Sequence, residues 1–252
     1  MKKIEDNKNY SGLYFLGDTH GYTRIPKLIN KRMGGGVIFH VGDFGIGFTN
    51  HVNELRNLKT LNGKLGNLDI KLYVIRGNHD DPKYFKESNK RQDVEDLNLD
   101  NVVLLSDHTM VTVTINDVNK NIYCNGGAVS IDRMGRVFDV SYWSDEKFIC
   151  PDDEELEKIV EVDIIVTHTR PNGVWPYTYN SLVEHFLMED SNLDYDLKRE
   201  SKRMFDMFEI IRKNNTHDIT HYYGHFHNSF TDFVDNIKHV CLDIGEIKEH
   251  II

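Results

Sequence analysis

Polar side chains that could bind metal ions are concentrated in five short segments, each directly after a short apolar run. They provide two carboxylates, four imidazoles and one carboxamide, from Asp18, His20, Asp43, Asn78, His168, His225 and His227. Mixed nitrogen and oxygen donors without a thiolate suit Mn²⁺, Fe or Zn²⁺ better than Ca²⁺ or Cu(I). Seven donors exceed the needs of one such ion, but they fit two ions that share a carboxylate. Two ions about 3.5–4 Å apart can orient a bridging hydroxide for in-line attack on phosphorus.

Two of the five segments separate their donors by a single residue. They read Asp18-x-His20 and His225-x-His227. In an extended or turning segment alternate residues point the same way, so both donors of each pair can reach one site.

A third segment, Gly77-Asn78-His79-Asp80, follows the apolar run at 72–75. Such a run is typical of a buried strand, and Gly77 allows the backbone to turn sharply at its carboxyl end. A carboxamide, an imidazole and a carboxylate are therefore delivered together to a loop at a strand end.

The elements that must position these residues follow from the apolar periodicity. Buried strands are predicted at 13–16, 37–41 and 72–75, and amphipathic helices between them at 25–33 and 52–65. This alternation predicts a parallel sheet with all three strands ending at the same edge. The polar segments that follow these strands should converge at that edge, where open α/β sheets build their sites.

The rest of the chain predicts a change in strand pairing. Short strands at 102–105, 109–115 and 121–124, with a turn at 116–120, indicate that the sheet is extended by antiparallel pairing. Further strands are predicted at 164–166, 219–223, 230–234 and 237–242.

Two helices and a lid are also expected in the second half. An acidic, solvated helix is predicted over 152–161, and an amphipathic helix over 193–213 with its apolar stripe in the core. The segment at about 174–190 has no clear period and is the best candidate for a lid over the site.

Composition favours a single α/β domain over residues 1–252, because 39% hydrophobic and 28% charged residues are typical of soluble globular proteins. No membrane span is expected, and the acidic start argues against a secretory signal.

Three widely separated cysteines, Cys124, Cys150 and Cys241, favour a reducing, cytoplasmic location over a disulfide framework. A net charge of −10 argues against binding of long nucleic acid, but it is compatible with a small phosphorylated substrate.

Taken in order, these segments resemble the motifs of the calcineurin-like metallophosphoesterases. The family pattern D-x-H, G-D, G-N-H-[DE], a lone His after a strand and G-H-x-H is matched between residues 13 and 242. The resemblance implies a two-sheet mixed β-sandwich flanked by helices, in four α/β/β/α layers. It also implies two ions that share Asp43. The first would be bound by Asp18, His20, Asp43 and His227, and the second by Asp43, Asn78, His168 and His225.

The resemblance also assigns roles beside the ligands. His79 would be the general acid that protonates the leaving oxygen, and Asp80 would orient that imidazole or support the loop. Protein Ser/Thr phosphatases of this superfamily extend the second motif to G-D-x-x-D-R-G, whereas this chain has Ile46 and Gly47 at the two charged positions. A protein phosphatase is therefore disfavoured, and phosphate must be bound by other residues.

Arg133 and Arg170 are the candidates for phosphate binding, because each lies in a predicted edge loop. For both arginines, a surface salt bridge is an equally good interpretation. Arg76, directly before Gly77, could brace the loop or face the ligand, and the sequence leaves both roles open.

Three functions remain to be compared. The favoured one is a phosphoesterase that uses two metal ions, most simply Mn²⁺ with Fe or Zn²⁺ as alternatives, on a small phosphomonoester or phosphodiester such as a nucleotide. A DNA or RNA nuclease would use the same metals, but it predicts a basic track that the sequence lacks. A non-catalytic protein-binding scaffold should have lost ligands or the acid, and here all are present. The natural substrate and the oligomeric state are left open.

Overall fold

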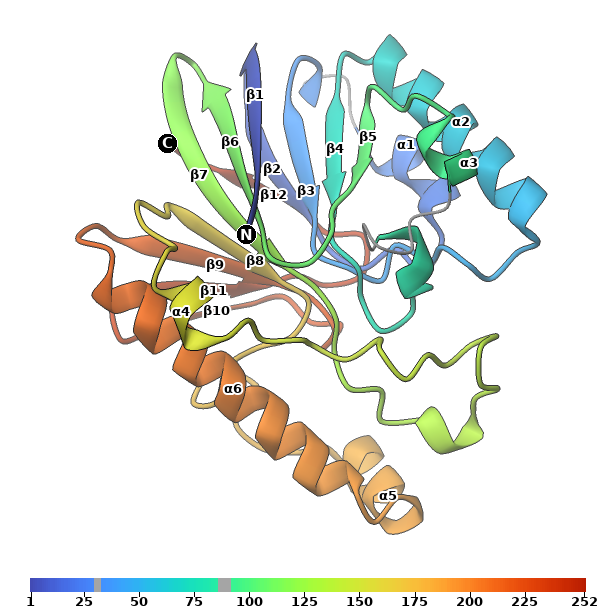
Figure 1. Cartoon of the computed structure of the whole chain (residues 1–252), viewed down its shortest axis with the longest axis vertical. Coiled ribbons are helices and arrows are strands. Elements are labelled where there is room, and N and C mark those ends of the chain that lie inside the picture. Colours follow the sequence, from blue (N-terminus) through green and yellow to red (C-terminus); the bar gives the residue numbers. More distant parts are fainter. Residues whose placement is uncertain (30–32, 86–91) are drawn as a thin grey trace.

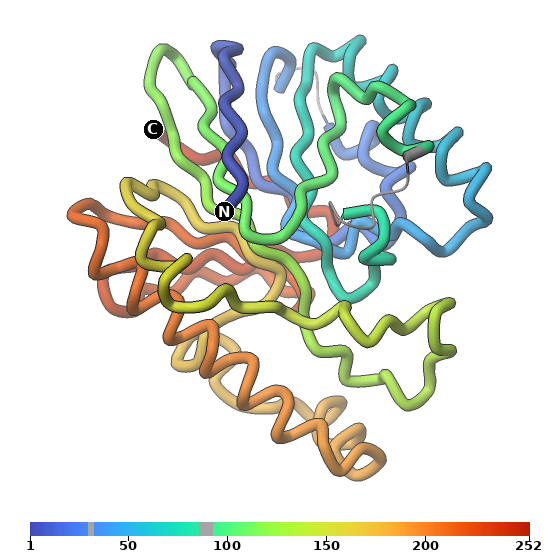
Figure 2. Tube along the Cα trace, in the orientation of Figure 1, coloured from blue at the N-terminus to red at the C-terminus, as the bar shows by residue number. Residues whose placement is uncertain are grey.

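The computed structural model describes residues 1–29, 33–85 and 92–252 and contains two mixed sheets that pack face to face (Figure 1). The strand order is β12-β2-β3-β4-β5 in the five-stranded sheet and β1-β6-β7-β8-β9-β11-β10 in the seven-stranded sheet. Helices lie on the outer faces of both sheets (Figure 2). The predicted two-sheet sandwich flanked by helices is confirmed.

The five-stranded sheet positions the first three polar segments. Its parallel strands are β2 (Leu13–Leu16), β3 (Val37–His40), β4 (Lys71–Val74) and β5 (Val102–Leu104), and β12 (Ile247–His250) pairs antiparallel with β2. The predicted parallel β2-β3-β4 core is confirmed. The expectation that the strand at 102–105 would pair antiparallel is wrong, because β5 continues the parallel sheet beside β4.

The seven-stranded sheet positions the remaining two segments. Its strands are β1 (Lys2–Tyr10), β6 (Thr109–Ile115), β7 (Val118–Asn125), β8 (Ile164–Thr167), β9 (Ile219–Tyr223), β10 (Phe230–Val234) and β11 (Ile237–Cys241). The β6–β7 hairpin turns at Asn116 and Asp117, whose φ angles of 49° and 67° suit a two-residue type I′ turn. Strand β1 was not predicted, because it is a largely exposed edge strand without apolar alternation.

The central strands β2, β3 and β4 are buried on both faces almost throughout, which explains their largely unbroken apolar sequences. In β2, Leu13 and Phe15 pack in the core between the two sheets, whereas Tyr14 and Leu16 pack outward in the cluster that includes α2. This alternation is the two-residue period of a strand. The same arrangement in β3 and β4 anchors the loops that follow them.

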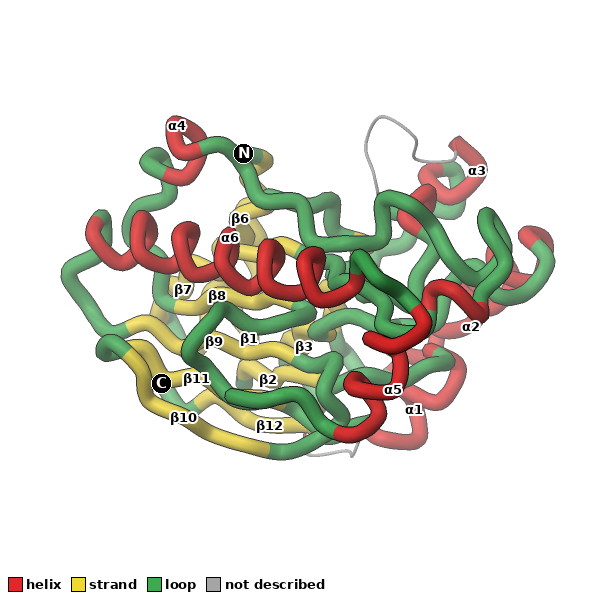
Figure 3. The backbone as a smooth tube through the Cα atoms, turned by 90° about the horizontal axis from the view of Figure 1, so that it is seen from below, coloured by secondary structure: helices red, strands yellow, loops and turns green. Residues whose placement is uncertain are grey.

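Helices form the outer layers (Figure 3). Those on the five-stranded sheet are α1 (Ile25–Leu28), α2 (His51–Asn67) and α3 (Gln92–Glu95), and those on the seven-stranded sheet are α4 (Asp153–Leu156) and α6 (Leu193–Lys213). Helix α5 (Ser181–Glu189) precedes α6, and 3₁₀ turns among the described residues include Tyr22–Arg24, Pro82–Tyr84 and Arg133–Gly135.

Two helices are shorter than predicted, and residues 30–32 of the helix expected at 25–33 lie outside the described residues. Helix α1 stops at Leu28, where the chain becomes extended at Ile29, and α4 ends well before Glu161, which has a φ of 57°. Within the described ranges, no helix is both long and apolar enough to cross a bilayer. Helix α6 reaches 21 residues but carries many charged side chains.

Candidate metal centre

The polar segments of both sheets meet at one site. Asp18, Asp43 and Asn78 follow β2, β3 and β4, while His168 follows β8 and His225 and His227 follow β9. The strands of two different sheets therefore supply one set of donors. All seven predicted ligands lie in this cluster, as the distances below show.

Four donors form the first part of the cluster. Ligand atoms of Asp18, His20, Asp43 and His227 all lie within 4.8 Å of one another. His227 Nε2 is 3.2 Å from Asp18 Oδ2 and 2.9 Å from His20 Nε2. The two carboxylates are buried and the two imidazoles are exposed, so this group is open to solvent on its imidazole side.

The second part of the cluster lies on the other side of Asp43. Asp43 Oδ1 is 3.2 Å from His168 Nε2, whereas Asp43 Oδ2 faces His20 Nδ1 at 3.9 Å. His168 Nε2 is also 3.0 Å from Asn78 Oδ1, and the His168 and His225 rings are 5.0 Å apart. The two oxygens of Asp43 thus face two different groups of donors, as a bridging ligand requires.

The backbone turns sharply at most of these ligands. His20, Asp43, His225 and His227 have φ angles of 45°, 53°, 70° and 49°, in the left-handed region that non-glycine residues rarely adopt. Hydrogen bonds hold these turns, because the Asp43 carbonyl accepts from the N–H groups of Thr19 and His20. The paired donors therefore converge through turns rather than through extended segments. Strained backbone of this kind gathers at functional sites.

Two glycines, Gly77 and Gly224, leave space for the carboxylates of Asp43 and Asp18. A Cβ on Gly77 would lie 2.1 Å from Asp43 Oδ1, and a Cβ on Gly224 would lie 2.0 Å from Asp18 Oδ1. Neither position can carry a side chain without displacing a ligand. This explains why a glycine precedes Asn78 and another precedes His225.

The electric field of the cluster favours cations. Burial opposes the charge of Asp43, but His168 outweighs it and holds the pKa of Asp43 well below its ordinary value. Burial likewise opposes a charged His168, but the Asp43 carboxylate raises the pKa of His168 to about 9. Buried carboxylates are costly without a nearby positive charge, and a metal ion supplies that charge. The donor set and its field therefore fit a pair of transition ions.

Sequence comparison identifies the family. The model of the calcineurin-like phosphoesterase family matches residues 13–229. The chain belongs to this family. It is therefore a metal-dependent phosphoric ester hydrolase, in agreement with the cluster described above. No curated protein sequence is significantly similar to this phosphoesterase.

Solved structures share the fold of the phosphoesterase. The protein TT1561 of Thermus thermophilus is 9% identical with a TM-score of 0.50, over 93% of this chain and 90% of that chain. A putative 5′-nucleotidase from Staphylococcus aureus is 11% identical with a TM-score of 0.54, over 92% of this chain and 48% of that chain. This chain thus spans about half of the length of the nucleotidase. Similarity at these identities concerns the fold.

His79 lies beside the metal ligands of the phosphoesterase. Its ring is edge-on to His20, with centroids 5.1 Å apart, and its backbone N–H donates to Asp43 Oδ1 at 2.7 Å. Arg136 Nη2 donates to His79 Nε2 at 2.7 Å. Burial and the charge of Arg136 lower the pKa of His79, although Asp43 opposes this. Arg136 was not singled out from the sequence, because only its position in the folded loop relates it to His79.

Asp80 supports the loops around the site. Its carboxylate accepts hydrogen bonds from the backbone N–H groups of Phe44, Gly45, Ile46 and Gly77 at 2.7–3.1 Å. These bonds join the loop after β3 to the loop after β4. Of the two roles expected for Asp80, support of the loop fits these contacts. Burial and the nearby Asp43 raise the pKa of Asp80 to about 7, against the effect of the N–H donors.

Replacement of Asp80 by alanine should lower the free energy of unfolding by about 3 kcal/mol, because three buried N–H groups and the half-buried N–H of Gly45 would lose their acceptor. Urea unfolding followed by circular dichroism measures this difference. Asp218→Ala is the control, since Asp218 is exposed. Equal stability of the two variants would contradict the supporting role.

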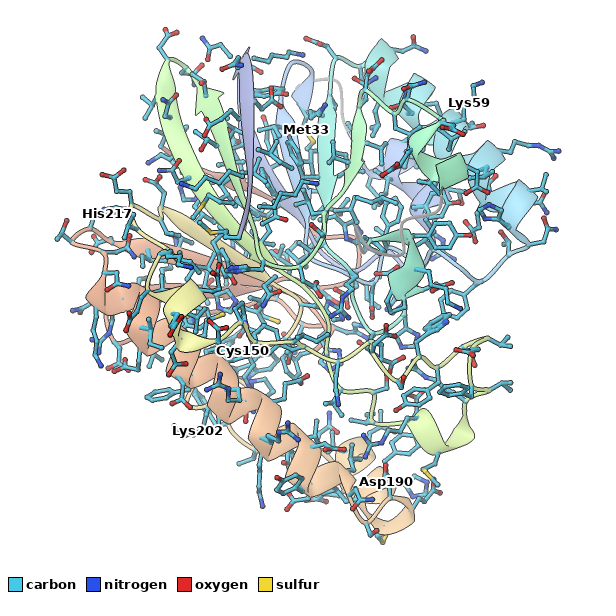
Figure 4. The ribbon with its side chains drawn as sticks, in the orientation of Figure 1. Met33, Lys59, Cys150, Asp190, Lys202 and His217 are labelled. Carbon is cyan, nitrogen blue, oxygen red and sulfur yellow. The ribbon has the colours of Figure 1, made fainter. Side chains whose placement is uncertain are left out.

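The two arginines expected to bind phosphate, Arg133 and Arg170, lie in different surroundings. Arg133 forms ion pairs with Asp190 at 2.5 Å and with Asp196 at 2.7 Å, at the corner where α5 meets α6 (Figure 4). Arg133 is not among the residues that line the pocket, so of its two interpretations these ion pairs favour the salt bridge. Arg170 lines the pocket and donates to the carbonyls of Pro171 and Pro176.

Arg76 braces the loop after β7. Its side chain is 1% exposed and pairs with Asp107 at 2.7 Å. It also donates to the carbonyls of Glu146 and Lys147. The sequence left open whether Arg76 braces the loop or faces the ligand, and these contacts fit the bracing role.

Ser130 is a supporting residue that the sequence did not reveal. Asn78 Nδ2 donates to Ser130 Oγ at 3.0 Å, and Ser130 in turn bonds to the buried carboxylate of Glu146. These bonds orient the Asn78 carboxamide so that its oxygen faces His168. Outer contacts of this kind tune metal affinity.

A pocket of about 650 Å³ opens beside the metal centre. Asp43, Asn78, His79 and Arg136 line one part, and residues of the segment 175–186 line another. The segment predicted as a lid thus lies along the pocket, partly as helix α5, although its motion remains a prediction. Both α5 and the loop at 126–150 project from the same end of the molecule (Figure 1).

Proposed function

We propose that this protein hydrolyses a small phosphomonoester or phosphodiester, such as a nucleotide, with two divalent metal ions held by the seven ligands. The observation that carries the proposal is the position of Asp43, whose two oxygens face two separate groups of donors. When bound, two cations supply Lewis acidity and a nucleophile derived from water at neutral pH. Mn²⁺ is the first choice, with Fe and Zn²⁺ as alternatives.

The first ion would be held by Asp18, His20, Asp43 and His227. Asp43 would also contribute to the second ion, together with Asn78, His168 and His225. Because the carboxylates lie on the buried side and His20 and His227 on the open side, the substrate would approach from the pocket.

His79 and Arg136 would act on the substrate. The Arg136 guanidinium, held by Asp132 at 2.6 Å, can bind a phosphoryl oxygen in the pocket. This contact would compete with its hydrogen bond to His79, so that His79 Nε2 could take up a proton from water and then donate that proton to the leaving oxygen. Arg170, which lines the same pocket, is the second candidate for binding an anionic group.

A turnover screen with the Mn²⁺-loaded protein tests the proposal. Its substrates are phosphomonoesters, cyclic nucleotides, dinucleoside polyphosphates and short oligonucleotides. We expect turnover on small phosphoesters, which would vanish after chelation and return with added Mn²⁺. Exclusive turnover of oligonucleotides would instead favour a nuclease, and no turnover of any phosphoester would contradict the proposed function.

A further inference from the structure

The pocket beside the metal centre is larger than a phosphate group requires. Its volume of about 650 Å³ lies in the range of pockets that enclose drug-sized ligands. Asp43, His79 and Arg136 line the part where the reacting phosphoryl group would lie. The remaining volume must therefore hold the rest of the substrate.

The wall of that remaining volume is largely apolar. Leu182, Val183 and Phe186 of α5 line it together with Leu197 of α6. No residue of α5 is buried, and Leu182 is 55% exposed. Contact with an apolar part of the substrate would remove this surface from water, which is favourable.

Aromatic side chains connect this wall to the metal ligands. Phe226 lies between His225 and His227 in the sequence, and its ring meets that of Trp175 edge-to-face, with centroids 6.2 Å apart at 78°. The guanidinium of Arg170 lies over the Phe226 ring at 6.0 Å. Flat groups of this kind favour a flat aromatic ring over a flexible alkyl chain.

Polar side chains interrupt the apolar wall. Thr178 and Asn228 line the pocket, and within the described residues their side chains form no hydrogen bond. They can therefore bond to polar atoms at the edge of a ligand. A sugar can bond to these groups and place a small C–H face on a ring, but it has no flat aromatic face, and an alkyl chain would use only the apolar wall. A nucleobase would use both.

We propose that Trp175, Phe226 and the pocket-facing side of α5 form a subsite for the base of a nucleoside phosphate. This inference rests on the proposed function and narrows its substrate class to nucleotides.

The test compares substrates that differ only by the base. Adenosine 5′-monophosphate and ribose 5-phosphate have the same sugar and the same type of leaving group. With the Mn²⁺-loaded protein we expect kcat/KM to be about 10- to 100-fold higher for the nucleotide, as base stacking predicts. The p-nitrophenyl phosphodiesters of the deoxyribose 5-hydroxyl and of the thymidine 5′-hydroxyl provide the same comparison for a diesterase.

Variants locate the subsite. Trp175→Ala and Phe186→Ala should each reduce the ratio of the two kcat/KM values about 10-fold. Met188→Ala is the matched control, because Met188 lies on α5, is 80% exposed and is not part of the pocket lining. The control should keep the ratio of the parent protein. A ratio that persists in both aromatic variants would overturn the assigned subsite.

Failure of the subsite and failure of the proposed function are distinguishable. Equal kcat/KM values for both substrates would overturn the subsite and leave the phosphoesterase function intact. If neither substrate is turned over, the subsite is tested by calorimetry, which measures the binding of adenosine and of ribose to the Mn²⁺-loaded protein. Binding of adenosine alone would support the subsite, and equal or absent binding of both would overturn it.

Discussion

Replacement of Asp43 by asparagine should release both metal ions and lower turnover about 10³-fold or more, since metal ions supply several kcal/mol of transition-state stabilisation. Asp43 is 1% exposed, and its two oxygens face separate groups of donors. Asparagine keeps the shape and can still accept the His79 N–H, but it removes the charge that both ions would share. Metal content after loading with Mn²⁺ and desalting measures the effect.

Asp18→Asn is the matched comparison for Asp43→Asn. Asp18 is equally buried and also accepts a backbone N–H, from His225 at 3.0 Å. However, Asp18 belongs to the first group of donors alone. Its variant should keep one ion per chain, whereas the Asp43 variant should keep none. An Asp43 variant that retained two ions would contradict the bridging role.

Replacement of His79 by alanine should leave both ions in place and lower kcat/KM for alkyl phosphates about 10²- to 10⁴-fold. Alkoxide leaving groups need a proton, which the His79 imidazole is positioned to supply at the pocket wall. Aryl phosphates with activated leaving groups need no proton, so their turnover should fall much less. Steady-state kinetics on glycerol phosphate and p-nitrophenyl phosphate measure the two losses.

His217→Ala is the control for the His79 variant. His217 is exposed and lies away from α5, beyond the other end of α6 (Figure 4). Its removal should not change either rate. Equal losses on both substrates in the His79 variant would argue against the general acid and for a role in substrate binding.

The metal cluster could be predicted from the sequence because its ligands follow recognisable strands. The runs that end before Asp18, Asp43 and Asn78 are buried on both faces, so their apolar residues are continuous and easily identified. Parallel strands then place their ends at one edge without further information. What the sequence could not provide is the left-handed backbone at the ligands, which depends on hydrogen bonds between distant loops.

The substrate side of the site was less predictable. Arg133 and Arg136 lie in the same loop, and no local pattern distinguishes them. Only tertiary contacts distinguish the two arginines. Arg133 pairs with carboxylates at the corner between α5 and α6, whereas Arg136 donates a hydrogen bond to His79. Helix α5 was expected only as part of a lid, although its apolar residues Leu182, Val183, Phe186 and Leu187 have a helical spacing. None of its residues is buried, so this apolar side faces the pocket and not the core.

Anomalous diffraction at the manganese edge, from crystals grown with Mn²⁺, tests the two-ion centre most directly. We expect two peaks about 3.5–4 Å apart, one on each side of the Asp43 carboxylate. A single peak, or peaks away from Asp43, would contradict this expectation.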